Sequence, residues 1–175
     1  VELMGGILNV RSEVAKGSEF FFTIELPVYQ GQLEESLKNN EVAGKYHVLQ
    51  GKNVLLAEDN DLNAEIAATM LEMQGVKVER VVNGQQAVDR FKETLPGTYD
   101  LILMDLQMPI KDGLEAAVEI RALERADARG IPIIAMTANT MQEDREKALS
   151  AGMNCFIPKP FDVEQLYQSI EKFLN

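Results

Sequence analysis

The chain has 175 residues, and its 28 acidic and 17 basic side chains give a formal net charge of −11 at pH 7. Such an acidic surface repels phosphate backbones and anionic lipid headgroups, so neither nucleic-acid binding nor direct membrane contact is expected. Hydrophobic residues make up 46% of the chain, the proportion of a globular protein, and no apolar run is long enough to cross a bilayer.

The first residues and the cysteine content indicate where the chain acts. Residues 1–4 lack the basic start and the apolar core of a signal peptide, and the absence of an initiator methionine indicates a fragment of a longer protein. Cys155 is the single cysteine and cannot form an internal disulfide. We therefore expect a reducing, cytoplasmic compartment, with any membrane anchor elsewhere in the parent protein.

Residues 1–28 are predicted to form a β-hairpin. Two apolar segments flank a turn signal at 16–18, and in the second of them Phe20 and Phe22 belong to an alternation with a period of two residues. A hairpin this small is marginally stable alone in water, so we expect it either to be mobile or to self-associate by pairing with another copy. The segment 29–50 that follows is mostly polar and is predicted to be a linker.

Residues 51–175 alternate between apolar runs and amphipathic patterns. The runs are short and bounded by polar or turn residues, which is typical of strands buried on both faces. They lie at residues 54–57, 76–82, 101–104, 131–136 and 155–157. Five repeats of strand and helix predict an α/β fold, a doubly wound five-stranded parallel sheet with helices on both sides.

The helices between these strands have recognisable ends. The first is predicted to end at Gly75, and the helix before the last strand at Gly152. Thr140 with Glu143 forms a predicted capping box, and Asp162 is the predicted N-cap of the final helix. The apolar stripes of the first and last helices consist of Leu62, Ile66, Met70 and Met73, and of Val163, Leu166, Tyr167, Ile170 and Phe173.

Acidic residues follow two of the predicted strands. Glu58 and Asp59 come directly after the first strand, and Asp105 follows the third. Functional groups in such sheets gather beyond the carboxyl ends of the strands, and if the strand order is 2-1-3-4-5 these carboxylates converge. A divalent cation would relieve their mutual repulsion, and oxygen ligands with room for water favour Mg²⁺.

The fourth and fifth strands end in a hydroxyl and an ammonium group. Thr137 lies at the end of the fourth strand, and Lys159 follows the fifth, next to Pro160. A carboxylate nucleophile, a metal ion, a hydroxyl and a lysine are the groups that an aspartyl phosphate needs, with Asp105 attacking phosphorus in line. We expect the Lys159–Pro160 peptide bond to be cis, which would direct the lysine inward.

Each of these residues also has an ordinary structural interpretation. The acidic pair after the first strand is suited to capping a helix and favouring its dipole. Asp105 is suited to a turn, and Lys159 to a solvated loop. The coincidence of these groups at four strand ends favours one functional site over separate structural roles.

Three stretches of this sequence are VLLAEDNDLNAEIA, YDLILMDLQMPIKDGLEA and IPIIAMTANTMQEDREKALSAGMNCFIPKPFD. They resemble the receiver domains of response regulators in two-component signalling, especially those attached to hybrid sensor histidine kinases. The resemblance covers residues 51–175. It implies a flavodoxin-like fold with the strand order 2-1-3-4-5.

The resemblance also implies the roles of individual residues. Asp105 is the expected phosphorylation site. The residues expected to hold Mg²⁺ are Asp59, Asp105, the backbone carbonyl of Gln107, and Glu58 either directly or through water. The residues expected to act on the phosphoryl group are Asp105, Thr137 and Lys159, with Thr137 also moving as part of a switch.

Weaker roles follow for four neighbouring positions. Phe156 occupies an aromatic switch position but lacks a phenol hydroxyl, and a core aromatic is the competing interpretation. Gln107 and Asn139 are expected to tune the lifetime of the phosphate. Cys155 is expected to be a buried filler and not a redox sensor.

The resemblance implies a phosphorelay. A histidine kinase or a histidine phosphotransfer protein is expected to exchange a phosphoryl group with Asp105, which switches the surface formed by the fourth strand, the next helix and the fifth strand. Partners are expected to dock on the first helix, beginning near Asn60. There Asn63, Ala64 and Ala67 are predicted to present a patch of small residues.

Residues 1–28 resemble the last part of a histidine-kinase ATP-binding domain. The catalytic motifs of such kinases are absent, so we expect this chain neither to bind ATP nor to phosphorylate other proteins, and the parent protein to be a histidine kinase. Two other functions stay open. One is a phosphorylation-independent interaction module on the same fold, and the other is a flavin or nucleotide binder, for which a glycine-rich phosphate loop is lacking.

Overall fold

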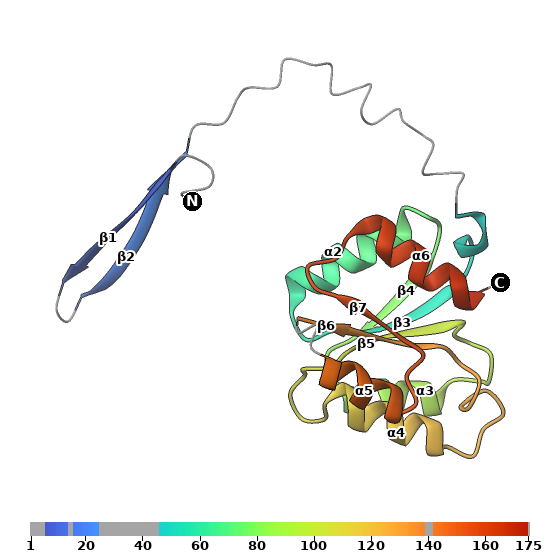
Figure 1. Cartoon of the computed structure of the whole chain (residues 1–175). Coiled ribbons are helices and arrows are strands. Elements are labelled where there is room, and N and C mark those ends of the chain that lie inside the picture. The colour runs from blue at the N-terminus through green and yellow to red at the C-terminus, as the bar shows by residue number, and fades with distance from the viewer. Residues whose placement is uncertain (1–5, 14–15, 25–45, 139–141, 175) are drawn as a thin grey trace. The chain divides into compact units, whose positions relative to one another are not determined.

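The protein is described from a computed structural model of the whole chain (Figure 1). The structure describes residues 6–13, 16–24, 46–138 and 142–174. Most of the predicted linker, together with Asn139 and the predicted capping residue Thr140, lies outside these residues. The chain divides into two compact units, Val1–Asn39 and Asn40–Asn175. No helix in the described ranges is long and apolar enough to cross a membrane.

The N-terminal unit contains the predicted hairpin. Strand β1 (Ile7–Glu13) pairs antiparallel with β2 (Gly17–Thr23). Since alternate residues of a strand point to the same side, the register gathers four large apolar side chains on one face of the hairpin. They are Leu8, Val10, Phe20 and Phe22, which are 56%, 57%, 70% and 54% exposed. The hairpin thus presents one apolar face.

The C-terminal unit is built on a parallel sheet. Its strands are β3 (Asn53–Ala57), β4 (Lys77–Val81), β5 (Leu101–Asp105), β6 (Ile133–Thr137) and β7 (Cys155–Pro158). Their order is β4-β3-β5-β6-β7, and every neighbouring pair is parallel. This is the order 2-1-3-4-5, so the predicted doubly wound sheet and its topology are confirmed.

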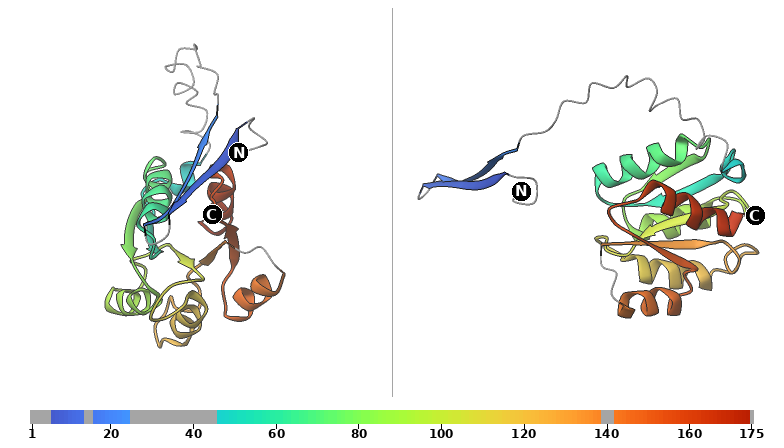
Figure 2. Two further views of the ribbon diagram at one scale, coloured as in Figure 1. Left: turned by 90° about the vertical axis from the view of Figure 1, so that its left-hand side faces the viewer. Right: turned by 45° about the horizontal axis from the view of Figure 1, so that its top comes forward.

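Helices cover both faces of this sheet (Figures 1 and 2). One layer contains α2 (Asp61–Glu72) and α6 (Val163–Leu174), and the other contains α3 (Gly84–Glu93), α4 (Gly113–Ala122) and α5 (Gln142–Ser150). Leu56 and Leu103 belong to the first core, whereas Leu55 and Ile102 belong to the second. Burial on both faces explains why the inner strands β3, β5 and β6 are nearly continuous apolar runs, whereas the edge strand β4 carries charged residues.

Most of the predicted helix ends are present. Gly75 and Gly152 follow α2 and α5 with φ angles of 75° and 87°, a left-handed conformation that glycine adopts without strain. The Asp162 carboxylate accepts a hydrogen bond of 2.9 Å from the backbone N–H of Gln165, which confirms the cap of α6. The predicted capping box of α5 involves Thr140 and stays a prediction.

The orientation of α2 differs from the prediction. The side chains of the predicted apolar stripe mostly face solvent: Leu62 is 64%, Ile66 39% and Met73 73% exposed. The buried face instead consists of Ala64, Ala67 and Leu71. Small alanine side chains let the helix lie close against the sheet, so the larger residues point outward.

A short segment before β3 packs on the helix layer that contains α2 and α6. Residues of the 3-10 helix η2 (His47–Leu49) lie in the predicted linker, yet Leu49 is fully buried and Tyr46 is only 3% exposed. The rings of Tyr46 and Tyr167 of α6 lie 5.1 Å apart. The packed unit therefore includes residues before 51.

Candidate functional site

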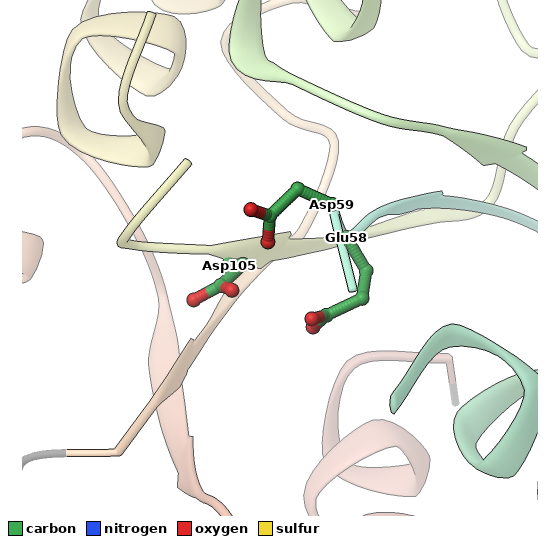
Figure 3. A group of neighbouring side chains, drawn as sticks. All are labelled: Glu58, Asp59 and Asp105. Carbon is green, nitrogen blue, oxygen red and sulfur yellow. The ribbon is translucent and has the colours of Figure 1, made fainter. Parts of the chain in front are cut away.

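The predicted carboxylates meet at one edge of the sheet. Glu58 and Asp59 follow β3, and Asp105 is the last residue of the neighbouring strand β5. One carboxylate oxygen from each lies within 4.8 Å of the others, and Figure 3 shows the three side chains gathered around one space. Glu58 is 1% and Asp105 6% exposed, whereas Asp59 is open to solvent. The convergence expected from the strand order is present.

Lys159 joins these carboxylates from the loop after β7. Its Nζ lies 2.5 Å from Glu58 Oε2 and 2.6 Å from Asp105 Oδ2. Its backbone N–H donates a hydrogen bond of 2.7 Å to the carbonyl oxygen of Thr137, and the Lys159–Pro160 peptide bond is cis, as predicted. One ammonium group is thus shared by two buried carboxylates, and the cluster keeps an excess of negative charge.

Burial dominates the electrostatics of Asp105. Burial raises the pKa of the Asp105 carboxyl above its ordinary value, and the nearby charge of Glu58 adds to this rise. The ion pair with Lys159 and a hydrogen bond of 3.1 Å from the backbone N–H of Gln107 act in the opposite direction. A further cation at this place would therefore favour the ionised carboxylate.

Two residues that were not predicted to belong to the site contact the acidic pair. The Asn63 side-chain amide donates to Glu58 Oε1 at 3.1 Å, and Arg80 of β4 donates to the backbone carbonyl oxygens of Glu58 and Asp59. The sequence carried a weak signal for each. Asn63 lies in the first turn after the N-cap Asn60, and Arg80 lies near the end of the strand beside β3.

The other predicted site residues lie at the same edge or beside it. Thr137 is the last residue of β6 and is buried. Gln107 is exposed in the loop after β5, and Phe156 is half-buried in β7. Cys155, expected to be buried, is only half-buried. Asn139 lies outside the described residues, so its expected role stays a prediction. The expected roles of Gln107 and Phe156 also stay predictions, because their positions alone do not test them.

The predicted docking patch on α2 is wrong in two of its three members. Ala64 and Ala67 are 2% and 1% exposed, because they form the face of α2 that packs on the sheet. Asn63 is half-buried and directed to Glu58. The apolar side chains that α2 offers to solvent near the acidic pair are those of Leu62 and Ile66 instead.

A glycine allows α4 to begin close to the end of β5, at Asp105. The backbone N–H of Gly113 donates to the carbonyl oxygen of Leu106 at 3.1 Å. A Cβ atom at this position would overlap with the carbonyl oxygen of Asp105. The absence of a side chain at Gly113 thus lets the loop after β5 close tightly behind Asp105.

Comparison with known proteins assigns the family. Residues 54–171 match the response regulator receiver domain family. The chain belongs to this family. The aerobic respiration control sensor protein ArcB of Escherichia coli is 36% identical over 171 residues, which cover 97% of this chain. Hybrid signal transduction histidine kinase K of Dictyostelium discoideum is 37% identical over 177 residues, which cover 98% of it. The chain spans 21% and 14% of the length of these two relatives.

Solved structures similar to this chain are also receiver domains. The receiver domain of the sensor histidine kinase PA1611 from Pseudomonas aeruginosa, with a magnesium ion coordinated in its active-site cleft, is 42% identical. That match has a TM-score of 0.64 and covers 71% of this chain and 98% of that one. The complex of the phosphotransfer protein Ypd1 with the receiver domain of Ssk1, from Saccharomyces cerevisiae, gives 34% identity and a TM-score of 0.61, covering 70% and 88%.

Proposed function

We propose that this receiver domain accepts a phosphoryl group on Asp105 from a phosphohistidine and relays it within a two-component system. The observation that carries the proposal is the fixed position of Asp105 between the acidic pair and Lys159. One oxygen of the Asp105 carboxylate is bound by the Lys159 ammonium and the other by a backbone N–H, so the nucleophile is held in one orientation. Membership of the receiver family supports this role.

The donor set fits Mg²⁺. The three carboxylates offer only oxygen ligands from adjacent strand ends, and hard divalent cations prefer such ligands. The magnesium ion in the related PA1611 receiver domain supports the same assignment. Glu58, Asp59, Asp105 and the carbonyl of Gln107 would hold the ion, which when bound neutralises negative charge on the phosphoryl oxygens.

Transfer forms one bond to phosphorus and breaks another. An oxygen of Asp105 attacks phosphorus on the side opposite the histidine nitrogen, the phosphorus–nitrogen bond breaks, and the leaving imidazole keeps the electron pair. Lys159 already contacts Asp105 and is suited to pair with the phosphoryl oxygens. The Thr137 hydroxyl at the end of β6 is suited to donate a hydrogen bond to the same group.

The position of these two residues suits a switch. Thr137 ends β6, Lys159 follows β7, and α5 connects the two strands. A phosphoryl group that draws both side chains toward Asp105 would therefore act on the β6–α5–β7 surface, to which the half-buried Phe156 belongs. We assign the switch to this surface.

Acetyl phosphate tests the acceptor role. The chain is incubated with Mg²⁺ and acetyl phosphate, and the intact mass is measured. We expect one phosphate-sized adduct on the wild type and on Asp100→Asn, which alters an aspartate at the opposite end of β5, and none on Asp105→Asn. An unlabelled wild type would favour a phosphorylation-independent interaction module instead, and an equal adduct on Asp105→Asn would place the phosphate elsewhere.

The partner proposed for this site is a histidine phosphotransfer protein or the histidine-bearing domain of a kinase. The solved complex of Ypd1 with a related receiver domain supports the first of these. The docking surface proposed here is the exposed apolar face of α2 formed by Leu62 and Ile66. This face is continuous with the acidic pair because α2 begins two residues after Asp59.

For the rest of the chain we propose that residues 1–28 are the end of a kinase ATP-binding domain, joined to the receiver domain by a linker that ends before the packed residues Tyr46 and Leu49. Sensor kinases that align along 97% of this chain support the arrangement. In the chain alone, the apolar face of the hairpin is proposed to drive self-association. Light scattering of the wild type and of Phe20→Ser with Phe22→Ser tests this, and a monomeric wild type contradicts it.

A further inference from the structure

One arginine spans the acidic loop after β3. Arg80 lies on the edge strand β4, and its Nε and Nη2 each donate to the carbonyl oxygen of Glu58 at 3.1 Å. Its Nη2 also donates to the carbonyl oxygen of Asp59 at 3.2 Å, and its Nη1 lies 2.8 Å from Asp61 Oδ1. The backbone N–H of Glu58 meanwhile donates to Val81 of the same strand at 3.0 Å. The loop is therefore fixed from β4 at several successive positions.

Arg80 contacts the backbone carbonyl groups of the acidic pair and not their carboxylates. The Glu58 carboxylate accepts from Asn63 and Lys159 instead. Among the described residues, none donates a hydrogen bond to the Asp59 carboxylate. The direction of the Asp59 side chain therefore depends on its backbone, and Arg80 holds the carbonyl group of that backbone.

The charge of Arg80 and its hydrogen bonds have opposite effects on a cation. A positive charge near the site repels a second cation, although Asp61 offsets that charge. The hydrogen bonds act the other way, because a loop held in place needs no ordering when the cation binds. If the charge dominates, removing Arg80 should strengthen cation binding. If the hydrogen bonds dominate, removing Arg80 should weaken it.

We infer that Arg80 is a positioning residue for the divalent cation site, holding the acidic loop so that Glu58 and Asp59 face Asp105. This inference rests on the proposed function, because it concerns Mg²⁺ at that site. Groups that orient metal ligands typically contribute about 10- to 100-fold to metal affinity. We therefore expect Arg80→Met to weaken Mg²⁺ binding about 10-fold.

The test is a Mg²⁺ titration of the whole chain, in which binding is measured from the changes in the NMR chemical shifts of the backbone amides. The matched control is Arg90→Met. Arg90 forms an ion pair with Glu79 of the same strand and has a side chain of similar exposure, 43% against 30% for Arg80. We expect the wild type and Arg90→Met to bind Mg²⁺ equally. Arg80→Lys should bind more weakly, because a point charge does not reproduce the fork that spans two carbonyl groups.

A second measurement does not depend on the metal. The backbone N–H of Glu58 donates to Val81 and that of Asn63 donates to Asn60 Oδ1. In metal-free protein, hydrogen exchange of these two amides is expected to be faster in Arg80→Met than in the wild type and in Arg90→Met. Unchanged exchange at these amides would overturn the inference. Should Arg80→Met fail to fold, Arg80→Lys carries both measurements.

Other outcomes of the titration reject the inference. Tighter Mg²⁺ binding by Arg80→Met, with wild-type affinity in Arg80→Lys, would mean that only the charge acts. Equal weakening in Arg80→Met and Arg90→Met would mean that both act through general stability. A wild-type chain that binds no Mg²⁺ contradicts the proposed function itself, whereas wild-type affinity in Arg80→Met rejects only the role of Arg80.

Discussion

Lys159 makes two ion pairs in the protein interior, where removing charged groups from water costs free energy. Its side chain is 12% exposed, and those of its partners Glu58 and Asp105 are 1% and 8% exposed. Buried ion pairs add little net stability, because the loss of hydration offsets most of the attraction. One ammonium group also cannot neutralise two carboxylates and the neighbouring Asp59. The arrangement is therefore better explained by ligand binding than by stability.

This excess of charge predicts the effect of Asp105→Asn. At neutral pH, with a chelator present to remove divalent cations, we expect the variant to unfold at a higher urea concentration than the wild type. Burial raises the pKa of Asp105, so its ionised form is unfavourable in the folded protein, and the amide removes that charge.

Saturating Mg²⁺ should reverse this order. A ligand at 100 times its Kd stabilises the folded wild type by about 2.7 kcal/mol, and the variant lacks one of the carboxylates proposed to hold the ion. Urea titrations with and without Mg²⁺ measure both effects. A variant that is less stable than the wild type in the chelator would contradict this account of the site.

Asp127 shows the opposite pKa shift and predicts a pH dependence. It accepts hydrogen bonds from Arg125 Nε at 2.6 Å and Nη2 at 2.9 Å, and one of 2.7 Å from the backbone N–H of Gly97. The Arg125 guanidinium holds the pKa of Asp127 below its ordinary value of 3.8. A lowered folded pKa contributes stability above the ordinary pKa, and this is lost as the pH falls through the folded value.

We therefore expect Asp127→Asn to reduce the free energy of unfolding by about 1 kcal/mol at neutral pH. The difference from the wild type should shrink as the pH falls below 3.8. Urea unfolding at a series of pH values measures it. A difference that stays constant down to acid pH would mean that the carboxylate charge has no role.

At the scale of the elements, the strands were more predictable than the helix faces. In a strand buried on both faces, side chains on either side of the sheet are apolar. The strand is therefore a run of apolar residues, and its position can be found without knowing which side chain faces which layer. Helix α2 carries apolar residues on two faces, and periodicity favours the larger ones. Close packing on the sheet selects the face with Ala64 and Ala67 instead. Only the three-dimensional arrangement decides between them.

Some residues of the site could be predicted from the sequence and others could not. Glu58, Asp59 and Asp105 were predictable because each follows a strand whose end lies at a known edge of the sheet. The contact of Arg80 with the acidic loop depends on how far a side chain of one strand extends across its neighbour. Sequence position does not carry that information.

The exposed face of α2 predicts where a partner binds. We expect Ile66→Glu to weaken binding of a phosphotransfer protein at least about 10-fold, because a buried charge in the centre of an interface is strongly unfavourable. The control is Val118→Glu, which alters an exposed valine on α4, on the opposite face of the sheet.

Binding is measured by titration calorimetry, and labelling by acetyl phosphate is measured in parallel. Both variants should be labelled like the wild type, since both residues are exposed and neither belongs to the proposed acceptor site. Equal weakening of partner binding by both variants would place the interface elsewhere.

At the scale of the whole molecule, the chain consists of a hairpin unit and a receiver unit that packs its own core. The family match begins at residue 54, but the packing begins earlier, because Tyr46 and Leu49 lie in the core beside α6. The segment before β3 is thus part of the receiver fold in energetic terms, although it precedes the region that defines the family.

Two truncations test this boundary. We expect a chain of residues 46–175 to unfold at the same urea concentration as the receiver unit of the whole chain. A chain of residues 51–175 should lose roughly 3–5 kcal/mol, because removing the fully buried Leu49 and the Tyr46 ring leaves a cavity against Tyr167. Leu49→Ala in the whole chain should show part of the same loss. Equal stability of the two truncated chains would mean that the contacts of this segment add nothing to the receiver fold.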